Sequence, residues 1–318
     1  MRTYRYLHYD VFTDTVFEGN QLAVFPEPAG LSTEEMQTIT REMNFSECTF
    51  IFPAETPGTN VRMRIFTPGE ELPMAGHPTI GSTFALVNEG VIKPGQDGFV
   101  FGLGVGPTPV SLEWKGTALD FAWMTQKTPE FGGIVADRGG FARALGVTPA
   151  DLAPPPPQPV SCGVPFLFAA LESRAAVDSV SLDSKSYAAA CQASGLDALP
   201  LFIFTTDRAP AAQAPGAGGS SAAGDADDAA VYSRMLAPGF GIAEDPATGG
   251  ASGPLGCYLF KHRLVPRDRL SHIVSLQGVK MRRPSRIHIS IDASGEEITR
   301  VRVGGRSVLV GDGRLSFA

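Results

Sequence analysis

Alternating apolar and polar positions recur along most of the chain, and this period of two is typical of half-buried strands. Short apolar stretches bounded by Gly, Pro, Asn or Asp mark where each strand would end. Fourteen strands are expected, over residues 4–12, 19–25, 48–52, 61–66, 98–103, 110–114, 119–123, 166–171, 201–205, 231–236, 274–281, 287–292, 299–303 and 307–310.

Four stretches carry helical signals instead. Residues 33–43 follow Ser32, with Glu35 three positions later, which is a capping box. Residues 78–87 form an apolar segment that opens on Pro78, a favoured first helical position. Residues 184–194 and the apolar segment 246–262 are the other two expected helices. Many strands with few helices predict an α+β protein.

Two stretches of the chain resemble each other. Arg64-Ile-Phe-Thr-Pro-Gly is followed after seven residues by His77-Pro-Thr-Ile-Gly-Ser, and Arg234-Met-Leu-Ala-Pro-Gly is followed after five residues by Asp245-Pro-Ala-Thr-Gly-Gly. Aligned through a two-residue gap, His77 corresponds to Asp245. Each copy predicts a strand, a Pro-Gly loop, a polar residue and an apolar helix, which indicates a duplicated unit; a chance similarity of short Pro/Gly motifs is the alternative.

The repeat suggests two pseudo-symmetric domains, 1–121 and 122–318, with the last strands possibly returning to the first domain. Residues 148–160 contain four consecutive prolines and resemble a linker. Residues 210–229 are low-complexity Ala, Gly, Ser and Asp, a composition that predicts a surface loop.

The two helix starts at Pro78 and Pro246 would face each other across a cleft. A helix N-terminus presents free N–H groups and a partial positive charge. Gly81 and Gly249 would let a ligand approach the backbone closely. Together these features predict a site for a small anion such as a carboxylate.

Composition narrows the function. The 318 residues contain 26 Lys and Arg against 33 Asp and Glu, a net charge of −7, which does not favour a nucleic-acid partner. No apolar run approaches a membrane span and no signal peptide is visible, so a cytoplasmic location is expected. The four cysteines are far apart and lack metal-ligand spacing, so we expect reduced thiols and no zinc.

Three ionisable residues are candidates for chemistry. Glu47 stands between a helix end and an apolar strand, where partial burial would raise its pKa toward that of a general base; the alternative is a carboxylate that satisfies a helix terminus or an arginine. His77 could instead bridge backbone groups in its loop. Asp245 could instead be a helix N-cap. Glu70, Glu71 and Glu244 are expected to be exposed, and Arg283 is expected in an exposed turn.

The motifs together resemble the PhzF-like proteins of phenazine biosynthesis, in family order from near the start to about residue 290. The segments that carry this resemblance are 10–14, 17–24, 44–49, 64–68, 71–79, 244–249 and 277–285. The resemblance implies the diaminopimelate-epimerase fold: two similar domains, each a curved, mostly antiparallel sheet around a central helix, with the active site between them.

The same resemblance implies a cofactor-independent isomerase that is usually a homodimer and whose named member isomerises trans-2,3-dihydro-3-hydroxyanthranilate. Glu47 falls on the family's catalytic glutamate, and His77 and Asp245 fall on assisting residues. The expected substrate-binding residues are Asn20, Gly76, Pro78, Thr248, Gly249 and Gly250. Gly250 stands where the family commonly has serine, and the cysteine pair of the amino-acid epimerases of this fold is absent.

The sequence therefore predicts an isomerase that moves a proton on a small carboxylate, with Glu47 as acid and base and no metal. An amino-acid or hydroxy-acid epimerase is the first alternative; it would need Asp245 or His77 as a second base. A non-catalytic protein that binds a metabolite is the second.

Overall fold

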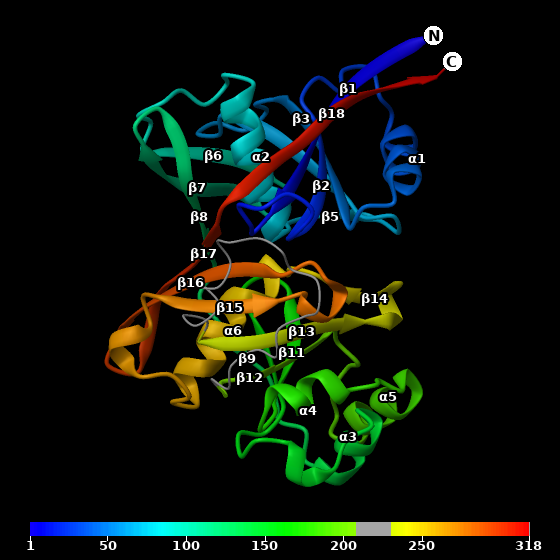
Figure 1. The fold of residues 1–318 in the computed structure, drawn as a ribbon, viewed down its shortest axis with the longest axis vertical. Coiled ribbons are helices and arrows are strands. Elements are labelled where there is room, and N and C mark those ends of the chain that lie inside the picture. Colours follow the sequence, from blue (N-terminus) through cyan, green and yellow to red (C-terminus); the bar gives the residue numbers. More distant parts are fainter. Residues whose placement is uncertain (208–229, 318) are drawn as a thin grey trace.

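The computed structural model describes residues 1–207 and 230–317. It forms two lobes, each a curved sheet with a helix inside it (Figure 1), so the expected α+β class is confirmed. The strands are β1 (Arg2–Val11), β2 (Asn20–Phe25), β3 (Glu47–Pro53), β4 (Val61–Phe66), β5 (Glu71–Leu72), β6 (Gly98–Leu103), β7 (Gly106–Lys115), β8 (Ala118–Gln126), β9 (Glu130–Phe131), β10 (Gln158–Ser161), β11 (Pro165–Ala170), β12 (Leu201–Thr205), β13 (Val231–Ala237), β14 (Ile242–Asp245), β15 (Ile273–Gln277), β16 (Ser285–Ser294), β17 (Glu297–Gly305) and β18 (Ser307–Phe317).

The helices are fewer and fall into two groups. Helices α2 and α6 are buried inside the sheets over most of their length, and the others lie outside them. Their bounds are α1 (Thr33–Met43), α2 (Gly76–Asn88), α3 (Arg138–Ala144), α4 (Arg174–Ser179), α5 (Ser184–Ala193) and α6 (Gly249–Lys261). None of the helices in the described part of the chain combines the length and the apolar character that a membrane crossing requires.

The strand pairings repeat between the two halves of the chain. In the first half β1 pairs antiparallel with β2, β2 parallel with β3, β3 antiparallel with β4, and β4 parallel with β6. In the second half β10, β11, β12, β13 and β15 repeat this order and these directions. The buried helix enters at the same place each time, α2 after β5 and α6 after β14. The duplicated unit that the sequence indicates is therefore present.

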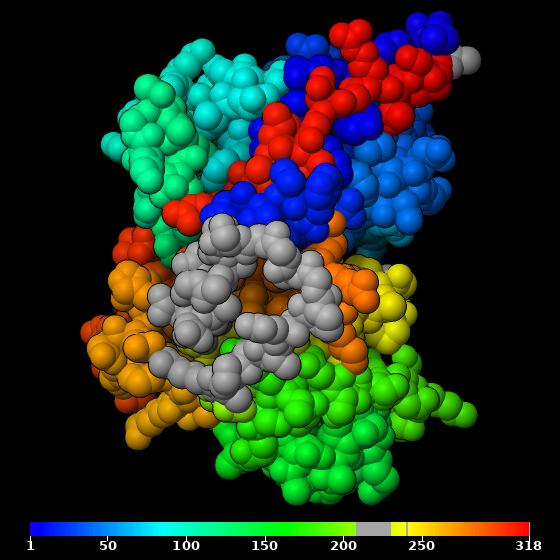
Figure 2. All heavy atoms as spheres, viewed as in Figure 1, coloured from blue at the N-terminus to red at the C-terminus, as the bar shows by residue number. Residues whose placement is uncertain are grey.

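The two halves exchange strands at their ends. β18 returns to pair with β1 along its whole length, and β9 pairs with β10 in the equivalent position. β8 and β17 pair with each other and join the two sheets. The two ends of the chain consequently run side by side over the first lobe (Figures 1 and 2). The predicted boundary between residues 121 and 122 falls inside β8.

Several expected bounds are confirmed and others change. Helix α1 has the predicted bounds, and Ser32 and Glu35 form the capping box. Helix α2 begins two residues before Pro78, and α6 begins three residues after Pro246. The strand expected over 274–281 stops at Gln277, because Gly278 turns the backbone into the left-handed region (φ 76°). Residues 148–160 are not a linker, since they run from a short 3₁₀ turn into β10. The loop expected over 210–229 lies outside the described residues.

Candidate active site

The first turns of α2 and α6 meet backbone to backbone. A Cβ atom added to Gly76 would lie 2.5 Å from the carbonyl carbon of Gly249, and one added to Gly249 would lie 3.1 Å from that of Gly76. Only glycine permits this approach. The expected role of Gly81 is wrong: it is the sixth residue of α2 and lacks a side chain because Leu22 and Val11 pack against it.

The structure also corrects the alignment of the repeat. Ile65 pairs with Leu72 in the first half, and Met235, the counterpart of Ile65, pairs with Asp245 in the second. Asp245 is therefore the counterpart of Leu72 and not of His77. Since Gly76 and Gly249 each begin a buried helix, the counterpart of His77 is Gly250. The segment from the arginine to the helix start is three residues longer in the second copy (Arg234 to Gly249) than in the first (Arg64 to Gly76). The sequence alignment instead made the second copy two residues shorter.

Glu47 and His77 lie side by side at the base of the site. Glu47 begins β3 and His77 is the second residue of α2. The Nδ1 atom of His77 lies 3.3 Å from Oε2 of Glu47, and the side chains are 3% and 13% exposed. Neither Oε2 of Glu47 nor Nε2 of His77 has a hydrogen-bond partner among the described residues. The oxygen of Glu47 that faces the imidazole is thus itself without a hydrogen bond, and the two groups are adjacent.

Asp245 is the third ionisable group, and it comes from the other half of the chain. Its Oδ1 accepts hydrogen bonds from Asn20 Nδ2 (2.8 Å) and Ser46 Oγ (3.3 Å), and its Oδ2 accepts one from Thr248 Oγ1 (2.5 Å). Asp245 does not cap α6, whose N-cap is Thr248. Asn20 also lies 3.4 Å from Nδ1 of His77, so this amide links the two halves of the site.

Gln277 holds the turn before α6, and sequence reasoning did not single it out as a site residue. Its Nε2 donates to the backbone oxygen of Asp245 (2.8 Å), and its Oε1 accepts from the N–H of Thr248 (3.1 Å). Its side chain is fully buried at the end of β15. The one sequence feature that could have identified Gln277 as a site residue is its position in segment 277–285, which carries the family resemblance.

Burial sets the charge state of these groups. It raises the pKa of Glu47 well above its ordinary value, and the nearby carboxylate of Asp245 raises it further. Burial also raises the pKa of Asp245 to about 6, against the opposing effect of its hydrogen bonds from Thr248, Asn20 and Ser46. It lowers the pKa of His77 to about 3. His77 is therefore neutral at pH 7, and its 3.3 Å contact with Glu47 is not a salt bridge.

A cavity of about 440 Å³, which we call the central cavity, opens onto these groups. Seven of the nine predicted site residues line it: Glu47, Gly76, His77, Asp245, Thr248, Gly249 and Gly250. Asn20 and Pro78 are absent from the described lining. Asn20 instead supports Asp245 from behind, and Pro78 is the third residue of α2. In the described part of the chain no group of three or more His, Cys, Asp or Glu is arranged to hold a metal ion.

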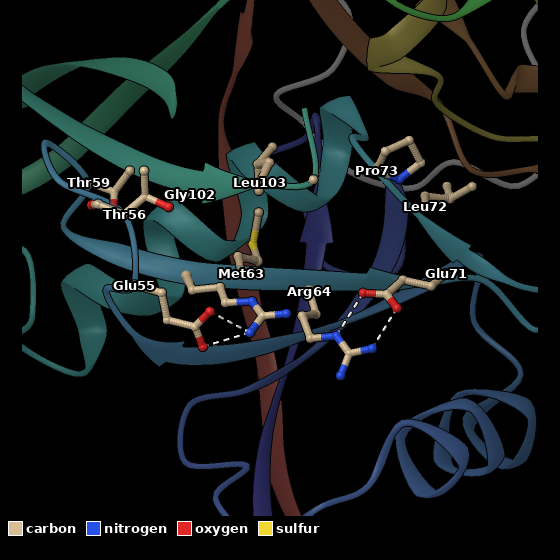
Figure 3. A pocket seen from close by; sticks show the side chains of 12 residues that line it. Glu55, Thr56, Thr59, Met63, Arg64, Glu71, Leu72, Pro73, Gly102 and Leu103 are labelled. Atoms are coloured by element: carbon tan, nitrogen blue, oxygen red, sulfur yellow. Dashed lines mark hydrogen bonds and ion pairs between the residues drawn. The ribbon is translucent and has the colours of Figure 1, made fainter. Parts of the chain in front are cut away.

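A second hollow lies on the first lobe, between β4 and the end of β6 (Figure 3). Its two arginines are already paired: Arg62 with Glu55 at 2.6 Å and Arg64 with Glu71 at 2.5 Å. In the second half, Arg234 makes the equivalent pair with Glu244 at 2.8 Å, but there the pair is largely buried. The expectation that Glu244 is exposed is thus wrong, because this copy of the hairpin packs against α4.

Arg283 is not in an exposed turn as expected. Its guanidinium reaches from the second half to the β1–β2 turn of the first, where Nη2 lies 2.5 Å from Asp10 Oδ1 and Nε donates to the carbonyl of Gly19 (2.8 Å). Asp10 is only 1% exposed and also accepts from the N–H of Phe17 (2.6 Å). Arg283 therefore fixes the chain directly before Asn20.

Comparison with known proteins assigns the family. The family described as "Phenazine biosynthesis-like protein" matches residues 9–313, so the chain belongs to it. It is 33% identical over 319 residues to an uncharacterized isomerase of Mesorhizobium japonicum, covering 99% of both chains. It is also 33% identical over 311 residues to the trans-2,3-dihydro-3-hydroxyanthranilate isomerase of Pseudomonas aeruginosa, covering 98% of this chain and 99% of that protein.

A solved structure shares the fold of this chain. The fold matches a phenazine biosynthesis protein of the PhzF family from Bacillus anthracis with a TM-score of 0.81 at 21% identity, and each chain is covered completely. This likeness confirms the expected diaminopimelate-epimerase-like fold. The names of the relatives confirm the expected class of enzyme, an isomerase.

Proposed function

We propose that the protein is a cofactor-independent isomerase that moves a proton on a small carboxylate, in a reaction similar to that of trans-2,3-dihydro-3-hydroxyanthranilate isomerase. Glu47 is the acid and base. The observation that carries the proposal is a buried carboxyl on the wall of the central cavity, with a raised pKa and an oxygen that has no hydrogen-bond partner among the described residues and lies 3.3 Å from a neutral imidazole.

A raised pKa suits a group that must both take and return a proton near neutral pH. In the first step the Glu47 carboxylate would remove a proton from a carbon next to the unsaturated system of the substrate. In the second step the protonated carboxyl would return it to another carbon on the same face. His77 and Asp245 would hold the polar groups of the substrate.

The substrate carboxylate is assigned to the paired helix N-termini. The first N–H groups of a helix have no acceptor inside the helix. Gly249 and Gly250 provide two such groups at the start of α6, and Gly76 provides one at the start of α2. These fixed dipoles would also stabilise the negative charge that develops when the proton leaves.

The repeat favours one base over two. Phe50 pairs with Arg64 in the first half, and Ile203 pairs with the equivalent Arg234 in the second, so Phe50 and Ile203 are counterparts. Glu47 lies three residues before Phe50. The residue three positions before Ile203 is Pro200, which is therefore the counterpart of Glu47. Pro200 lines the central cavity but cannot accept a proton. An epimerase with bases on opposite faces would have to use Asp245 or His77, and the hydrogen bonds of Asp245 already occupy both of its oxygens.

The test is proton exchange in D2O, followed by NMR over a panel of small unsaturated carboxylates. We expect the protein to incorporate deuterium into a substrate and shift its double bond, and Glu47→Gln to slow this by about 10²–10⁴-fold. Glu70→Gln is the matched control, because Glu70 lines the same cavity but is exposed, and its activity should be unchanged.

Other outcomes separate the alternatives. Full turnover by Glu47→Gln would refute the assignment of the base. A product of inverted configuration with no shifted double bond would identify an epimerase. A metabolite that binds tightly and is recovered unchanged and without deuterium would identify a binding protein.

A further inference from the structure

The central cavity has a polar side and an apolar side. The ionisable groups Glu47, His77 and Asp245 gather on one side, around the start of α2. The apolar residues come mostly from the second half of the chain: Val164, Phe166, Leu199, Pro200, Met235 and Ile242. None of the described lining residues is Lys or Arg. A wholly polar substrate would leave this apolar surface uncovered.

Gly250 lines the cavity and leaves room there. A Cβ atom added at Gly250 would have the ring of Phe166 as its nearest neighbour, at 3.8 Å, which is ordinary van der Waals contact. The other two glycines at these helix starts, Gly76 and Gly249, have no such room because each packs against the other. The backbone of Gly250 is not in the left-handed region, so neither packing nor conformation requires glycine at this position.

The counterpart of Gly250 shows what the missing side chain opens. In the first half of the chain, the second residue of the buried helix is His77, whose imidazole fills the space beside Glu47. In the second half the same position has only hydrogen, next to Phe166. The space is continuous with the cavity, since Gly250 and Phe166 both line it.

We propose that Gly250 and Phe166 are adjacent walls of a subsite for an apolar substituent, so that the substrate is a carboxylate with an aryl or similarly bulky apolar group. This inference rests on the proposed function only for the position of the carboxylate at the helix starts. The apolar group lies against Phe166, on the side of the cavity away from Glu47. The subsite selects the substrate and takes no part in proton transfer.

The experiment compares two probes, propionate and 3-phenylpropionate, by protein-observed NMR titration. They share the carboxylate and differ by one phenyl group. We expect 3-phenylpropionate to bind roughly tenfold to a hundredfold more tightly, as the burial of a ring side chain predicts. Gly250→Val should remove most of this preference, measured as the ratio of the two affinities, by filling the space. Gly250→Ala should reduce the preference by a smaller factor.

Controls separate the subsite from folding and from catalysis. Gly311→Val places the same side chain in open space on β18 and should leave both affinities unchanged. Glu47→Gln should keep the preference for 3-phenylpropionate over propionate, even where it abolishes exchange.

Equal binding of the two probes by the parent protein, or an equal loss of both in Gly250→Val with the fold intact by circular dichroism, would overturn the subsite and leave the proposed function standing. Binding of neither probe would overturn the carboxylate site and the subsite together.

Discussion

Replacing Gly76 by alanine tests the contact on which the site is built. The added methyl group would lie 2.5 Å from the carbonyl carbon of Gly249, 2.6 Å from the nitrogen of Gly250 and 2.7 Å from the Cα of Gly249. All three atoms are backbone, so no side chain can rotate away. The first turns of α2 and α6 would have to separate, and the N–H groups assigned to the carboxylate would separate with them.

The magnitude follows from two opposing effects. Overpacking of a buried contact costs about 1–3 kcal/mol, and the upper end applies because backbone must move. Alanine recovers up to about 1 kcal/mol over glycine in a helix. The free energy of unfolding should therefore fall by about 2 kcal/mol. In Gly250→Ala the added Cβ has its nearest neighbour at 3.8 Å. This variant receives the same gain without the overpacking, so it should be neutral or slightly stabilising.

Urea denaturation followed by circular dichroism measures the free energy of unfolding of both variants. Equal slopes of this free energy against urea concentration show that the values are comparable. NMR titration with propionate then tests the site, and Gly76→Ala should bind it at least about tenfold more weakly, a loss that corresponds to one strong hydrogen bond. If Gly76→Ala proved as stable as Gly250→Ala and bound propionate normally, the two helix starts would not meet as described.

Three further predictions follow from charged groups. Arg283→Met should lower the free energy of unfolding by about 3 kcal/mol, because it leaves a buried carboxylate without its partner; urea denaturation measures this, and a change under 1 kcal/mol would contradict the role of Arg283. Arg234→Met should cost about 3–5 kcal/mol and its counterpart Arg64→Met only about 1 kcal/mol, since only the Arg234 pair is largely buried; equal costs would refute this difference. Burial raises the pKa of Asp245 to about 6, so the folded protein keeps a proton that the unfolded chain releases near pH 4, and stability falls as the pH rises between these values. The substituted side chain of Asp245→Asn cannot ionise, so the free energy of unfolding of this variant relative to the parent should increase by up to about 3 kcal/mol from pH 4 to pH 7. Urea denaturation of both proteins across this pH range measures the difference, and a difference that does not change with pH would refute the burial of Asp245.

Local patterns were enough to predict the elements that depend on local physics. Residues 61–66, 98–103 and 201–205 form strands with the predicted bounds. Residues 201–205 are a short apolar run, and in residues 61–66 apolar residues alternate with Arg62 and Arg64. The capping box at α1 is likewise a matter of neighbours along the chain. The two-residue strands β5 and β9 have no such signal, because they exist only through the partners they pair with.

The errors at the site have a common physical cause. Asp245-Pro246 looks like a helix start, but pairing of Asp245 with Met235 and the hydrogen bonds from Gln277 hold this segment extended and delay the helix to Gly249. Arg283 looks like a surface residue because its partner Asp10 is far away along the chain. In each case a contact between distant segments outweighs the local preference, and a single sequence carries no record of such contacts.

The corrected repeat explains how a duplicated unit became a one-sided site. Each of the three ionisable groups Glu47, His77 and Asp245 has a counterpart that cannot titrate: Pro200 for Glu47, Gly250 for His77 and Leu72 for Asp245. All six residues line the central cavity. A symmetric pair of bases would suit inversion at one carbon, because the proton leaves and returns on opposite faces. Here the duplication has kept the paired helix starts, to which we assign the substrate carboxylate, but has only one carboxyl at the position of Glu47. The cavity is therefore suited to moving a proton along one face of a substrate, and its other side is left for recognition of an apolar group.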